Sequence, residues 1–288
     1  MSSTKSICTD AASENCPCYL ANTGNCLICG RLNKKDKCQC DWCGVCIFSQ
    51  LNFNDYKLTN RRKEIEMEVI KREYIHPDFM VMTVSAPVSF VIRTMMPGSY
   101  VFMRNPDTNH FFDAPISVIS ANITKATFNV GIRIISSKTK SLTECSDKVL
   151  VRGPYRNGIE GFNNKMTGQD ILILAKGAGV CPAIMAVNCL SSRNNVTLAV
   201  HDGELERKIM EMEEITNTLS TLSNPPSTVI ILGCSSFCND TKSALQPLYP
   251  AATFHLSRND IMCCGEGICG ACGKAQTPDG LAPLCKLK

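Results

Sequence analysis

The spacing of four cysteines near the end of the chain constrains its fold more than any other feature. Cys264, Cys269 and Cys272 are separated by four and then two residues, and Cys285 follows after twelve more. This is the plant-type spacing of cysteines that hold a [2Fe–2S] cluster, in which four thiolates converge on two irons. Three thiols on one tight loop and a fourth on a returning segment meet this need. The sequence therefore predicts a [2Fe–2S] cluster at these four cysteines, in a segment that covers residues 261–288.

The residues between these cysteines are rich in glycine. Glycine allows positive φ angles and a close approach of the backbone, so that N–H groups can point at the sulfurs. A disulfide pair or a zinc knuckle would use the same cysteines, but neither needs this glycine pattern, so the sequence favours the cluster. Cys263, next to a predicted ligand, is expected to point away. The glycines are Gly265, Gly267, Gly270 and Gly273.

The composition restricts the compartment and the class of partner. The 288 residues include 19 cysteines, and the 30 basic residues nearly balance the 26 acidic ones. We therefore expect neither nucleic acid nor a membrane surface as a partner. The N-terminal residues show no signal peptide, and no apolar run is long enough for a membrane span. The expected location is cytoplasmic and reducing, where so many thiols indicate metal or redox roles rather than disulfides.

A second set of cysteines is concentrated in residues 1–54. Nine lie between Cys8 and Cys46, among polar residues and glycine, so we expect no apolar core there and an order that depends on bound metal. With Cys8 left aside, eight thiols fit one four-ligand site with spare thiols or two such sites. Their spacing suits zinc and an iron–sulfur cluster equally, and a partly oxidised tail without metal is the third possibility. The eight are Cys16, Cys18, Cys26, Cys29, Cys38, Cys40, Cys43 and Cys46.

From Glu64 onward the sequence alternates apolar and polar residues and is rich in β-branched side chains, which indicates strands. Six short runs separated by turn residues predict a small antiparallel β-barrel over residues 60–155. The predicted strands are residues 65–70, 79–86, 100–103, 116–120, 127–135 and 147–153.

The pattern changes again near Asp170. Residues 171–175 are apolar throughout, as expected for a parallel strand buried on both faces. A glycine loop at residues 176–182 then opens into a predicted helix, and the free N–H groups of such a loop favour an anion such as phosphate, although a simple glycine turn would look the same. We expect a parallel α/β domain over residues 156–260. Its other elements are strands at 196–200 and 228–232 and an amphipathic helix at 204–222.

The order of a barrel, an α/β domain and a C-terminal C-x4-C-x2-C-x12-C motif resembles the electron-transfer subunits of dihydroorotate dehydrogenase B and related ferredoxin-NADP reductase-like proteins. The resemblance covers about residues 60 to 288 and is strongest at the four C-terminal cysteines. It implies a multidomain α+β protein, with an FAD-binding barrel, an NAD(P)-binding α/β domain and a [2Fe–2S] loop. The cysteine-rich N-terminal segment, predicted to bind metal, would precede these parts.

The resemblance places the FAD site on the barrel. The family's Arg-Pro-Ile-Ser-like segment falls on residues 113–117, where the arginine that would neutralise the flavin diphosphate is missing and Asp113 brings a negative charge. The resemblance implies that basic and hydroxyl side chains on the next strand and loop compensate for the missing arginine. A Gly-Pro segment matches the family's linker between the two domains. The implied FAD-binding residues are Pro115, Ile116, Ser117, Arg133, Lys138, Thr139 and Gly153.

The resemblance also places a nicotinamide nucleotide on the α/β domain. Cys234 is implied to lie near the nicotinamide, although a small buried thiol at a strand end is the alternative. Asp202 and Glu204 follow the second parallel strand and would disfavour a 2′-phosphate, so NADH is expected rather than NADPH. The implied nucleotide-binding residues are Gly177, Gly179, Pro182, Gly233 and Cys234.

The resemblance implies an oxidoreductase subunit that passes electrons between NAD(P)H, FAD and the [2Fe–2S] cluster, to or from a partner oxidoreductase subunit or a ferredoxin. The competing hypothesis is a scaffold or relay subunit whose flavin site has been lost and which holds only iron–sulfur or zinc centres. The missing arginine supports this alternative, whereas the glycine loop and the cluster cysteines oppose it.

Overall fold

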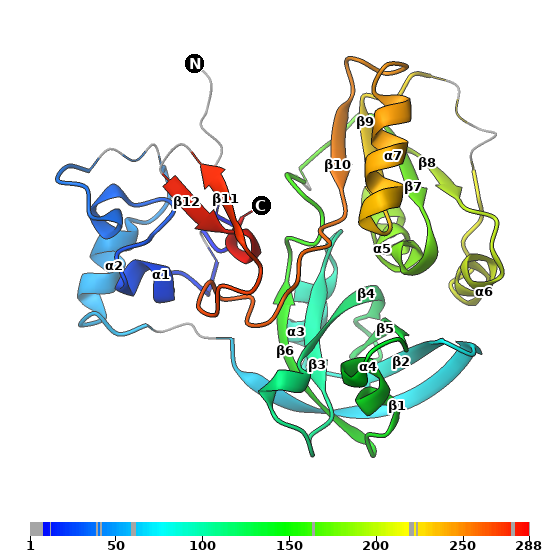
Figure 1. Ribbon diagram of the computed structural model, residues 1–288, viewed down its shortest axis with the longest axis horizontal. Helices are drawn as coiled ribbons and strands as arrows, with labels where there is room; N and C mark the ends of the chain where they lie inside the picture. The colour runs from blue at the N-terminus through cyan, green and yellow to red at the C-terminus, as the bar shows by residue number, and fades with distance from the viewer. Residues whose placement is uncertain are drawn as a thin grey trace. The chain divides into compact units, whose positions relative to one another are not determined.

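The structure, a computed structural model, describes residues 8–11, 13–38, 40, 42–58, 62–162, 165–218, 222, 224–277 and 280–287. The chain forms two compact units, one of residues 64–259 and one of residues 1–63 together with 260–288 (Figure 1). The second unit contains both the N-terminal cysteine-rich segment and the C-terminal cysteine loop, which the sequence predicts as two separate segments. No helix in the described part of the chain is long and apolar enough to cross a bilayer.

Six antiparallel strands close into the barrel that the sequence predicts. They pair in the order β1-β2-β5-β4-β3-β6. In β2 the side chains of Met80, Met82 and Val84 are fully buried in the barrel interior, and the alternate residues face outward. The strands are β1 (Glu64–His76), β2 (Phe79–Ser85), β3 (Tyr100–Arg104), β4 (Ala114–Asn122), β5 (Thr127–Arg133) and β6 (Lys148–Tyr155) (Figure 1).

The outer face of the barrel is itself apolar where it meets the next part of the chain. Phe79 of β2 and Ile119 of β4 share one buried cluster with Ala183 and Ile184 of helix α5 (Val180–Leu190). Both faces of these strands are therefore removed from water, which is favourable in proportion to the apolar area buried. This packing explains why the barrel and the α/β sheet form a single unit.

Two short helices of the barrel are absent from the sequence prediction. Helix α3 (Val88–Thr94) buries Phe90 and Val91 against the barrel core. Helix α4 (Ser137–Thr143) begins with a capping box, in which Ser136 and Thr139 exchange hydrogen bonds between side chain and backbone. Such caps satisfy N–H groups that have no partner within the helix. Each helix has only seven residues, too few for a clear helical period in the sequence.

The α/β part is a four-stranded parallel sheet, as the sequence predicts, with one strand that it does not predict. The order is β10-β9-β7-β8. Every residue of β9 is buried, which fits its place between two neighbours with both faces covered. The strands are β7 (Asp170–Ala175), β8 (Asn195–Val200), β9 (Thr228–Leu232) and β10 (Thr253–Leu256), and the helices are α5, α6 (Glu204–Met212) and α7 (Ser235–Leu245) (Figure 1).

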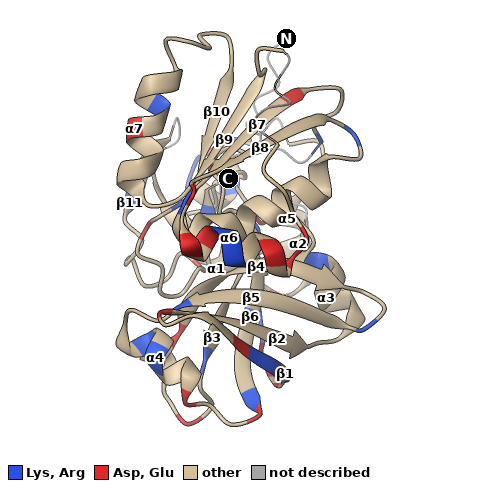
Figure 2. Cartoon of the chain, turned by 90° about the vertical axis from the view of Figure 1, so that its right-hand side faces the viewer, with Lys and Arg blue, Asp and Glu red and all other residues tan. Residues whose placement is uncertain are grey.

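The prediction of one helix over residues 204–222 is wrong beyond Met212. Glu214 has a left-handed backbone with φ 55°, which ends the helix. Thr218 then pairs with β8 instead, because its N–H donates to the Leu198 carbonyl and its hydroxyl accepts the Leu198 N–H. Residues 219–221 of the predicted helix lie outside the described residues. The part that is helical carries neighbouring acidic and basic residues (Figure 2), such as Glu204 and Lys208 at 2.8 Å.

The other unit is small and is assembled from both ends of the sequence. Cys8 forms an isolated antiparallel bridge with Leu287, and the N–H of Thr9 donates to the Lys286 carbonyl at 2.9 Å. Its strands, β11 and β12, form a two-stranded antiparallel sheet. The elements are α1 (Tyr19–Asn22), η1 (Gly30–Asn33), α2 (Ile47–Phe53), β11 (Lys274–Thr277), β12 (Gly280–Pro283) and η5 (Leu284–Lys286).

The expectation that the cysteine-rich segment has no apolar core is wrong. Ala21, Leu32, Ile47 and Leu51 are buried together with two cysteines. The apolar residues are few and scattered among polar ones, so no periodic pattern marks them in the sequence. The cysteines themselves supply part of this core, because a thiol packs as a small apolar group.

Candidate functional site

The C-terminal cysteine loop directs backbone N–H groups at its sulfur atoms. Cys264 Sγ accepts hydrogen bonds from the N–H groups of Glu266 and Cys269, at 3.3 and 3.5 Å. Cys269 Sγ accepts the N–H of Ala271 at 3.5 Å, and Cys272 Sγ accepts the N–H of Cys285 at 3.4 Å. N–H groups in this arrangement stabilise negative charge on sulfur, as metal-bound thiolates require.

The glycines of this loop make that arrangement possible. All four have positive φ, between 69° and 74°, a conformation that costs other residues about 1–2 kcal/mol. A Cβ on Gly267 would also lie 3.1 Å from Lys286 Cγ and 3.2 Å from Leu20 Cδ2. The four left-handed turns explain why glycine recurs between the cysteines. They are Gly265, Gly267, Gly270 and Gly273.

The thiols of the loop lie close enough to share protons. A hydrogen bond from the Cys285 thiol lowers the pKa of Cys264 to about 3, with help from the backbone N–H groups and against the effect of burial. The same hydrogen bond, together with burial, raises the pKa of Cys285. Cys285 also interacts with Cys272, and Cys264 with Cys269. The sulfurs thus form a row of neighbours in the order Cys269, Cys264, Cys285 and Cys272, and a [2Fe–2S] cluster needs four neighbouring thiolates, two for each iron.

This donor set fits a [2Fe–2S] cluster better than one metal ion. The sulfurs of a tetrahedral zinc site lie about 3.8 Å apart, for Zn–S bonds of about 2.3 Å. In the described part of the chain, the only three potential ligands with donor atoms all within 4.8 Å of one another are Glu64, His110 and Asp113. No three of the loop sulfurs are therefore as close as one ion requires. Cys272 and Cys285 are buried, whereas Cys269 is exposed and would bring one side of a cluster to the surface.

The glycine loop of the α/β part lies where the sequence places it, after β7 and directly before α5. Gly177 has φ 60°, and residues Gly177–Gly179 form a short 3-10 helix, η3. A Cβ on Gly179 would lie 2.2 Å from the Leu232 carbonyl oxygen at the end of β9. Gly179 is therefore needed for contact between the loop and the sheet. Pro182 is buried in the first turn of α5, where its missing N–H has no cost.

The sequence gives no sign that a carboxylate lies at this loop. Glu206, on the first turn of α6, accepts the N–H of Gly177 at 2.8 Å and is only 8% exposed in its side chain. His201 Nδ1 lies 3.5 Å from the same carboxylate oxygen. A phosphate bound at this loop would accept the same Gly177 N–H. That place is already taken by the negatively charged carboxylate of Glu206.

The end of β9 meets this loop at the same edge of the sheet, as expected for parallel strands. The N–H of Lys176 donates to the Leu232 carbonyl at 3.0 Å, and Gly233 is the next residue after this strand. Cys234 is exposed, so the alternative of a buried thiol at this position is wrong. A hydrogen bond with Ser236 and the N–H of Phe237 lower the pKa of Cys234. Its thiol is therefore accessible and readily ionised beside the glycine loop.

At the edge of the barrel, Asp113 does not carry a free negative charge. The carboxylate is buried, with Arg152 Nη2 at 3.0 Å and Arg104 Nε at 3.2 Å. Lys138 also donates to the Asp113 carbonyl at 3.1 Å. Arg152 lies over the Phe102 ring, 4.7 Å from its centroid. The two arginines are distant in sequence from the 113–117 segment, which is why sequence reasoning missed them.

The other residues that the resemblance implies for FAD binding differ from one another in exposure and in their partners. Pro115 is exposed and Ser117 is partly exposed on β4, while Ile116 points into the barrel core. Thr139 caps α4, next to Lys138. Arg133 forms an ion pair with Asp78 at 3.4 Å, at the turn between β1 and β2. Gly153 lies in β6 with φ 147°.

The charge balance at Asp113 removes the objection that the sequence raised against FAD. Two arginines and Lys138 surround Asp113 and Glu64, since Arg104 also pairs with Glu64. The local charge is therefore positive, as a flavin diphosphate requires. The same arginines make a cation unfavourable at Glu64, His110 and Asp113, although these three ligand atoms lie close together.

The eight N-terminal cysteines do not all converge. Cys16, Cys18 and Cys26 line one pocket together with Cys8, which the sequence prediction left aside. Cys29 is buried next to them, and its N–H donates to Cys26 Sγ at 3.3 Å. The remaining four are more exposed, and the sulfurs of one pair, Cys38 and Cys40, lie 3.9 Å apart. The other pair is Cys43 and Cys46.

Comparison with curated sequences finds relatives among electron-transfer subunits. No family model matches the chain. The chain is 24% identical over 226 residues to the electron transfer subunit of dihydroorotate dehydrogenase B (NAD(+)) of Streptococcus pneumoniae, a match that covers 72% of this chain and 89% of that subunit. It is 34% identical over 91 residues to the gamma subunit of sulfhydrogenase 1 of Pyrococcus furiosus, covering 31% of this chain but only 30% of that subunit.

Solved structures with a similar fold confirm the expected fold class. An NADH-dependent reduced ferredoxin-NADP oxidoreductase, described for flavin-based electron bifurcation, matches with a TM-score of 0.59 and 16% identity, over 76% of this chain and 85% of that one. Phthalate dioxygenase reductase, which transfers electrons from pyridine nucleotides to [2Fe–2S], matches with a TM-score of 0.52 and 13% identity, over 78% and 95%. In sequence the chain is similar to the electron-transfer subunits of dihydroorotate dehydrogenase B, and its barrel and parallel sheet have the fold of ferredoxin reductase-like proteins.

Proposed function

We propose that the chain is an electron-transfer flavoprotein subunit that carries electrons between NAD(P)H, FAD and a [2Fe–2S] cluster, to or from a partner oxidoreductase. The C-terminal loop is the observation that carries this proposal. Its four thiols are neighbours of one another, and backbone N–H groups point at three of the sulfurs. The relatives named above include the electron transfer subunit of dihydroorotate dehydrogenase B, which supports the same role here.

The barrel would hold FAD at the segment that follows Asp113. Arg104 and Arg152 neutralise the Asp113 carboxylate, and Lys138 adds a further positive charge. These groups would stabilise the diphosphate, while Ser117 and Thr139 offer hydroxyl groups. When bound, a flavin exchanges a hydride with a nicotinamide and single electrons with an iron–sulfur cluster. We propose that Arg133 contributes only long-range charge, since Asp78 already engages it.

The carboxyl edge of the parallel sheet would hold the nicotinamide nucleotide. Gly177 and Gly179 let the loop approach a ligand, and the exposed Cys234 lies at the end of the neighbouring strand. We propose NADH rather than NADPH, because Asp202 and Glu204 lie after β8. Both acids have basic partners, Arg207 at 2.5 Å and Lys208 at 2.8 Å, which weakens this discrimination.

The exposed Cys269 supports transfer to a second protein, because a cluster near the surface can reach a partner's acceptor. We propose another oxidoreductase subunit or a ferredoxin as that partner. The 19 cysteines of the chain also favour a reducing compartment such as the cytoplasm, where thiols serve metal or redox roles.

One observation favours the competing scaffold function. Glu206 already accepts the N–H of Gly177, so the loop is occupied by a carboxylate of the chain itself. A protein that has lost nucleotide binding could keep such a contact. In that case the iron–sulfur centres would relay electrons without a flavin.

Cofactor analysis of protein purified under argon distinguishes the two functions. The flavoprotein proposal predicts FAD close to one per chain, released on denaturation, together with iron and sulfide. Serine at all four loop cysteines, Cys264, Cys269, Cys272 and Cys285, should remove the [2Fe–2S] signal of the reduced protein and leave the FAD. Iron and sulfide without flavin would establish the scaffold function instead.

A further inference from the structure

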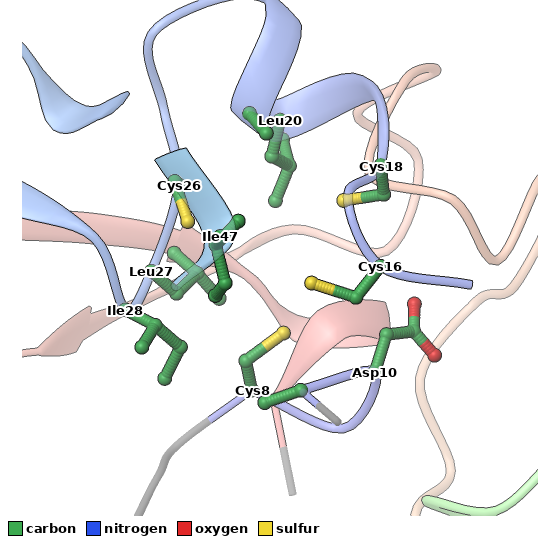
Figure 3. A pocket seen from close by; sticks show the side chains of 11 residues that line it. Cys8, Asp10, Cys16, Cys18, Leu20, Cys26, Leu27, Ile28 and Ile47 are labelled. Carbon is green, nitrogen blue, oxygen red and sulfur yellow. The ribbon is translucent and has the colours of Figure 1, made fainter. Parts of the chain in front are cut away.

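A pocket in the smaller unit brings together four thiols from separate parts of the N-terminal segment. It is lined by Cys8, Cys16, Cys18 and Cys26. Figure 3 shows the sulfurs of Cys8, Cys16 and Cys18 turned toward this space, with Cys26 on its far side. Apolar side chains complete the wall. These are Leu20, Leu27, Ile28 and Ile47.

Cys8 belongs to this set because of its bridge to the C-terminal end of the described chain, not because of its spacing from the other cysteines. It is 8% exposed and bridges to Leu287, next to the C-terminal loop. That bridge turns the Cys8 side chain into the pocket opposite the Cys16–Cys18 pair (Figure 3). A thiol held in this way supplies the fourth ligand without any of the more exposed cysteines.

The carboxylate that also lines the pocket is engaged elsewhere. Asp10 accepts a hydrogen bond from Arg62 Nη2 at 2.6 Å and a second from the buried ammonium of Lys286. In Figure 3 its oxygens are turned away from the sulfurs. The ligands available to a metal in this pocket are therefore thiols alone.

The spacing of the sulfurs indicates which metal centre they suit. No three of them lie mutually within 4.8 Å, since Glu64, His110 and Asp113 are the only such set among the described residues. One zinc ion needs four sulfurs about 3.8 Å apart. The sulfurs are therefore spaced too widely to bind a single ion together.

The pocket also differs from the C-terminal loop. There each sulfur interacts with at least one other sulfur of the loop, as expected where two thiolates share one iron. Among the described residues, no hydrogen bond joins Cys8, Cys16, Cys18 or Cys26 to another of these four sulfurs. Separated thiolates suit a cubane, in which each of four irons takes one cysteine.

We propose that Cys8, Cys16, Cys18 and Cys26 hold a [4Fe–4S] cluster. The site is distinct from the C-terminal [2Fe–2S] cluster and does not depend on flavin or nucleotide binding. Ion pairs link the two sites, because Asp10 lines the pocket and its partner Lys286 directly follows Cys285, while Arg62 joins Asp10 to Glu266 of the C-terminal loop. Lys286 is fully buried, and its positive charge would offset part of the negative charge of both clusters.

The test compares two double variants of the full chain, prepared and reconstituted under argon. Cys8→Ser with Cys16→Ser removes two proposed ligands. Cys43→Ser with Cys46→Ser removes two exposed cysteines of the same segment that do not line the pocket. Iron, sulfide and zinc per chain are measured, together with the paramagnetic signals after reduction.

The expected result is about six irons per chain in the native protein and in the control, and about two in the pocket variant, which keeps the [2Fe–2S] signal. Unchanged iron in the pocket variant, or zinc in place of the missing iron, would overturn the proposal. If the pocket variant loses both clusters because it fails to fold, the iron content and the paramagnetic signals of the native protein test the proposal. Two distinct signals and about six irons support the cubane, and one signal with about two irons excludes it.

Discussion

The ammonium group of Lys286 contacts the carboxylate of Asp10, 276 positions away in the sequence, and its side chain has no exposed surface. Arg62 and Glu266 complete the cluster, with Arg62 Nη1 at 3.0 Å from Glu266 Oε1. Burial alone would lower the pKa of Lys286, but the negative charges around it outweigh burial and raise that pKa. The lysine is therefore charged, and this ion cluster ties the first described residues to the last.

Lys286→Met should lower the free energy of unfolding of the smaller unit by about 3–5 kcal/mol, because it leaves Asp10 buried with one partner fewer. Chemical denaturation followed by a signal of this unit, such as the visible absorbance of its cluster, would measure the loss. Lys148→Met is the matched control, since Lys148 pairs with Glu66 at an exposed site. The control should change the free energy of unfolding far less, because an ion pair exposed to water contributes little to stability. Equal effects of the two variants would contradict the importance of the buried pair.

Gly267→Ala should impair the C-terminal cluster more than Gly270→Ala. Both glycines have a left-handed backbone, with φ 74° and 73°, so each substitution costs about 1–2 kcal/mol. Only the Cβ at Gly267 would press on other groups, Lys286 and Leu20, while nothing lies within 4 Å of one at Gly270. The rate of iron loss to a chelator measures the difference. Equally fast loss from both variants would show that the contact at Gly267 has no effect.

Glu206→Gln should strengthen the binding of NADH. The substitution keeps an acceptor for the Gly177 N–H but removes the negative charge that opposes a phosphate at this loop. Charges at helix N-termini contribute about 0.3–1 kcal/mol, which corresponds to a decrease in Kd of about two- to fivefold. Titration of the oxidised protein with NADH and with NAD⁺ measures the Kd. Glu211→Gln, an exposed residue of the same helix, is the control, and weaker binding in Glu206→Gln would show that the carboxylate holds the loop open for the nucleotide.

Arg152→Ala should raise the Kd for FAD about tenfold or more. The arginine pairs with Asp113 at 3.0 Å, and without it a negative charge remains next to the flavin diphosphate. A hydrogen bond to a charged group contributes about 1.5–3 kcal/mol of stabilisation. Flavin per chain after gel filtration, and fluorescence titration of the apoprotein with FAD, give the effect. Lys125→Ala, at an exposed turn of the barrel, should leave the flavin content unchanged. An Arg152→Ala protein with full flavin would place the diphosphate elsewhere.

Cys234 should be alkylated at lower pH than an ordinary cysteine. The Ser236 hydroxyl and the Phe237 N–H lower its pKa, so a larger share is thiolate at neutral pH, and the reaction rate falls only when the pH drops below that lowered value. Peptide mass spectrometry after brief iodoacetamide treatment between pH 6 and 9 resolves this site. Cys181, whose burial raises its pKa to about 12, should stay unmodified. Ser236→Ala should move the Cys234 profile to higher pH, and an unmoved profile would exclude the hydroxyl as the cause.

The barrel and the parallel sheet are predicted well from sequence because their residues repeat at the period of a strand. Alternating burial in β5 and continuous burial in β9 both leave a clear pattern. The helix predicted to run to Leu222 is wrong because Thr218 gains two hydrogen bonds to β8, which no local pattern reveals. The same limit applies to the site, where the spacing of the C-terminal cysteines predicts a cluster but says nothing about residues from other parts of the chain.

Residues that come together only through the fold were missed. Cys8 joins the N-terminal thiols through Leu287, and Arg104 and Arg152 reach Asp113 from other strands of the barrel. Glu206 reaches the glycine loop from a different helix. Each of these contacts joins segments at least 9 residues apart, as Arg104 and Asp113 are, so spacing and local pattern carry no signal for them.

The bridge between Cys8 and Leu287 bears on how the protein is made. Residues 8–58 leave the ribosome long before residues 260–287, so their structural partners do not yet exist while the barrel and the sheet are being synthesised. The smaller unit can close only after translation has passed its last strand. Metal insertion at either set of thiols therefore belongs to a late stage of maturation, after the larger unit has had time to fold.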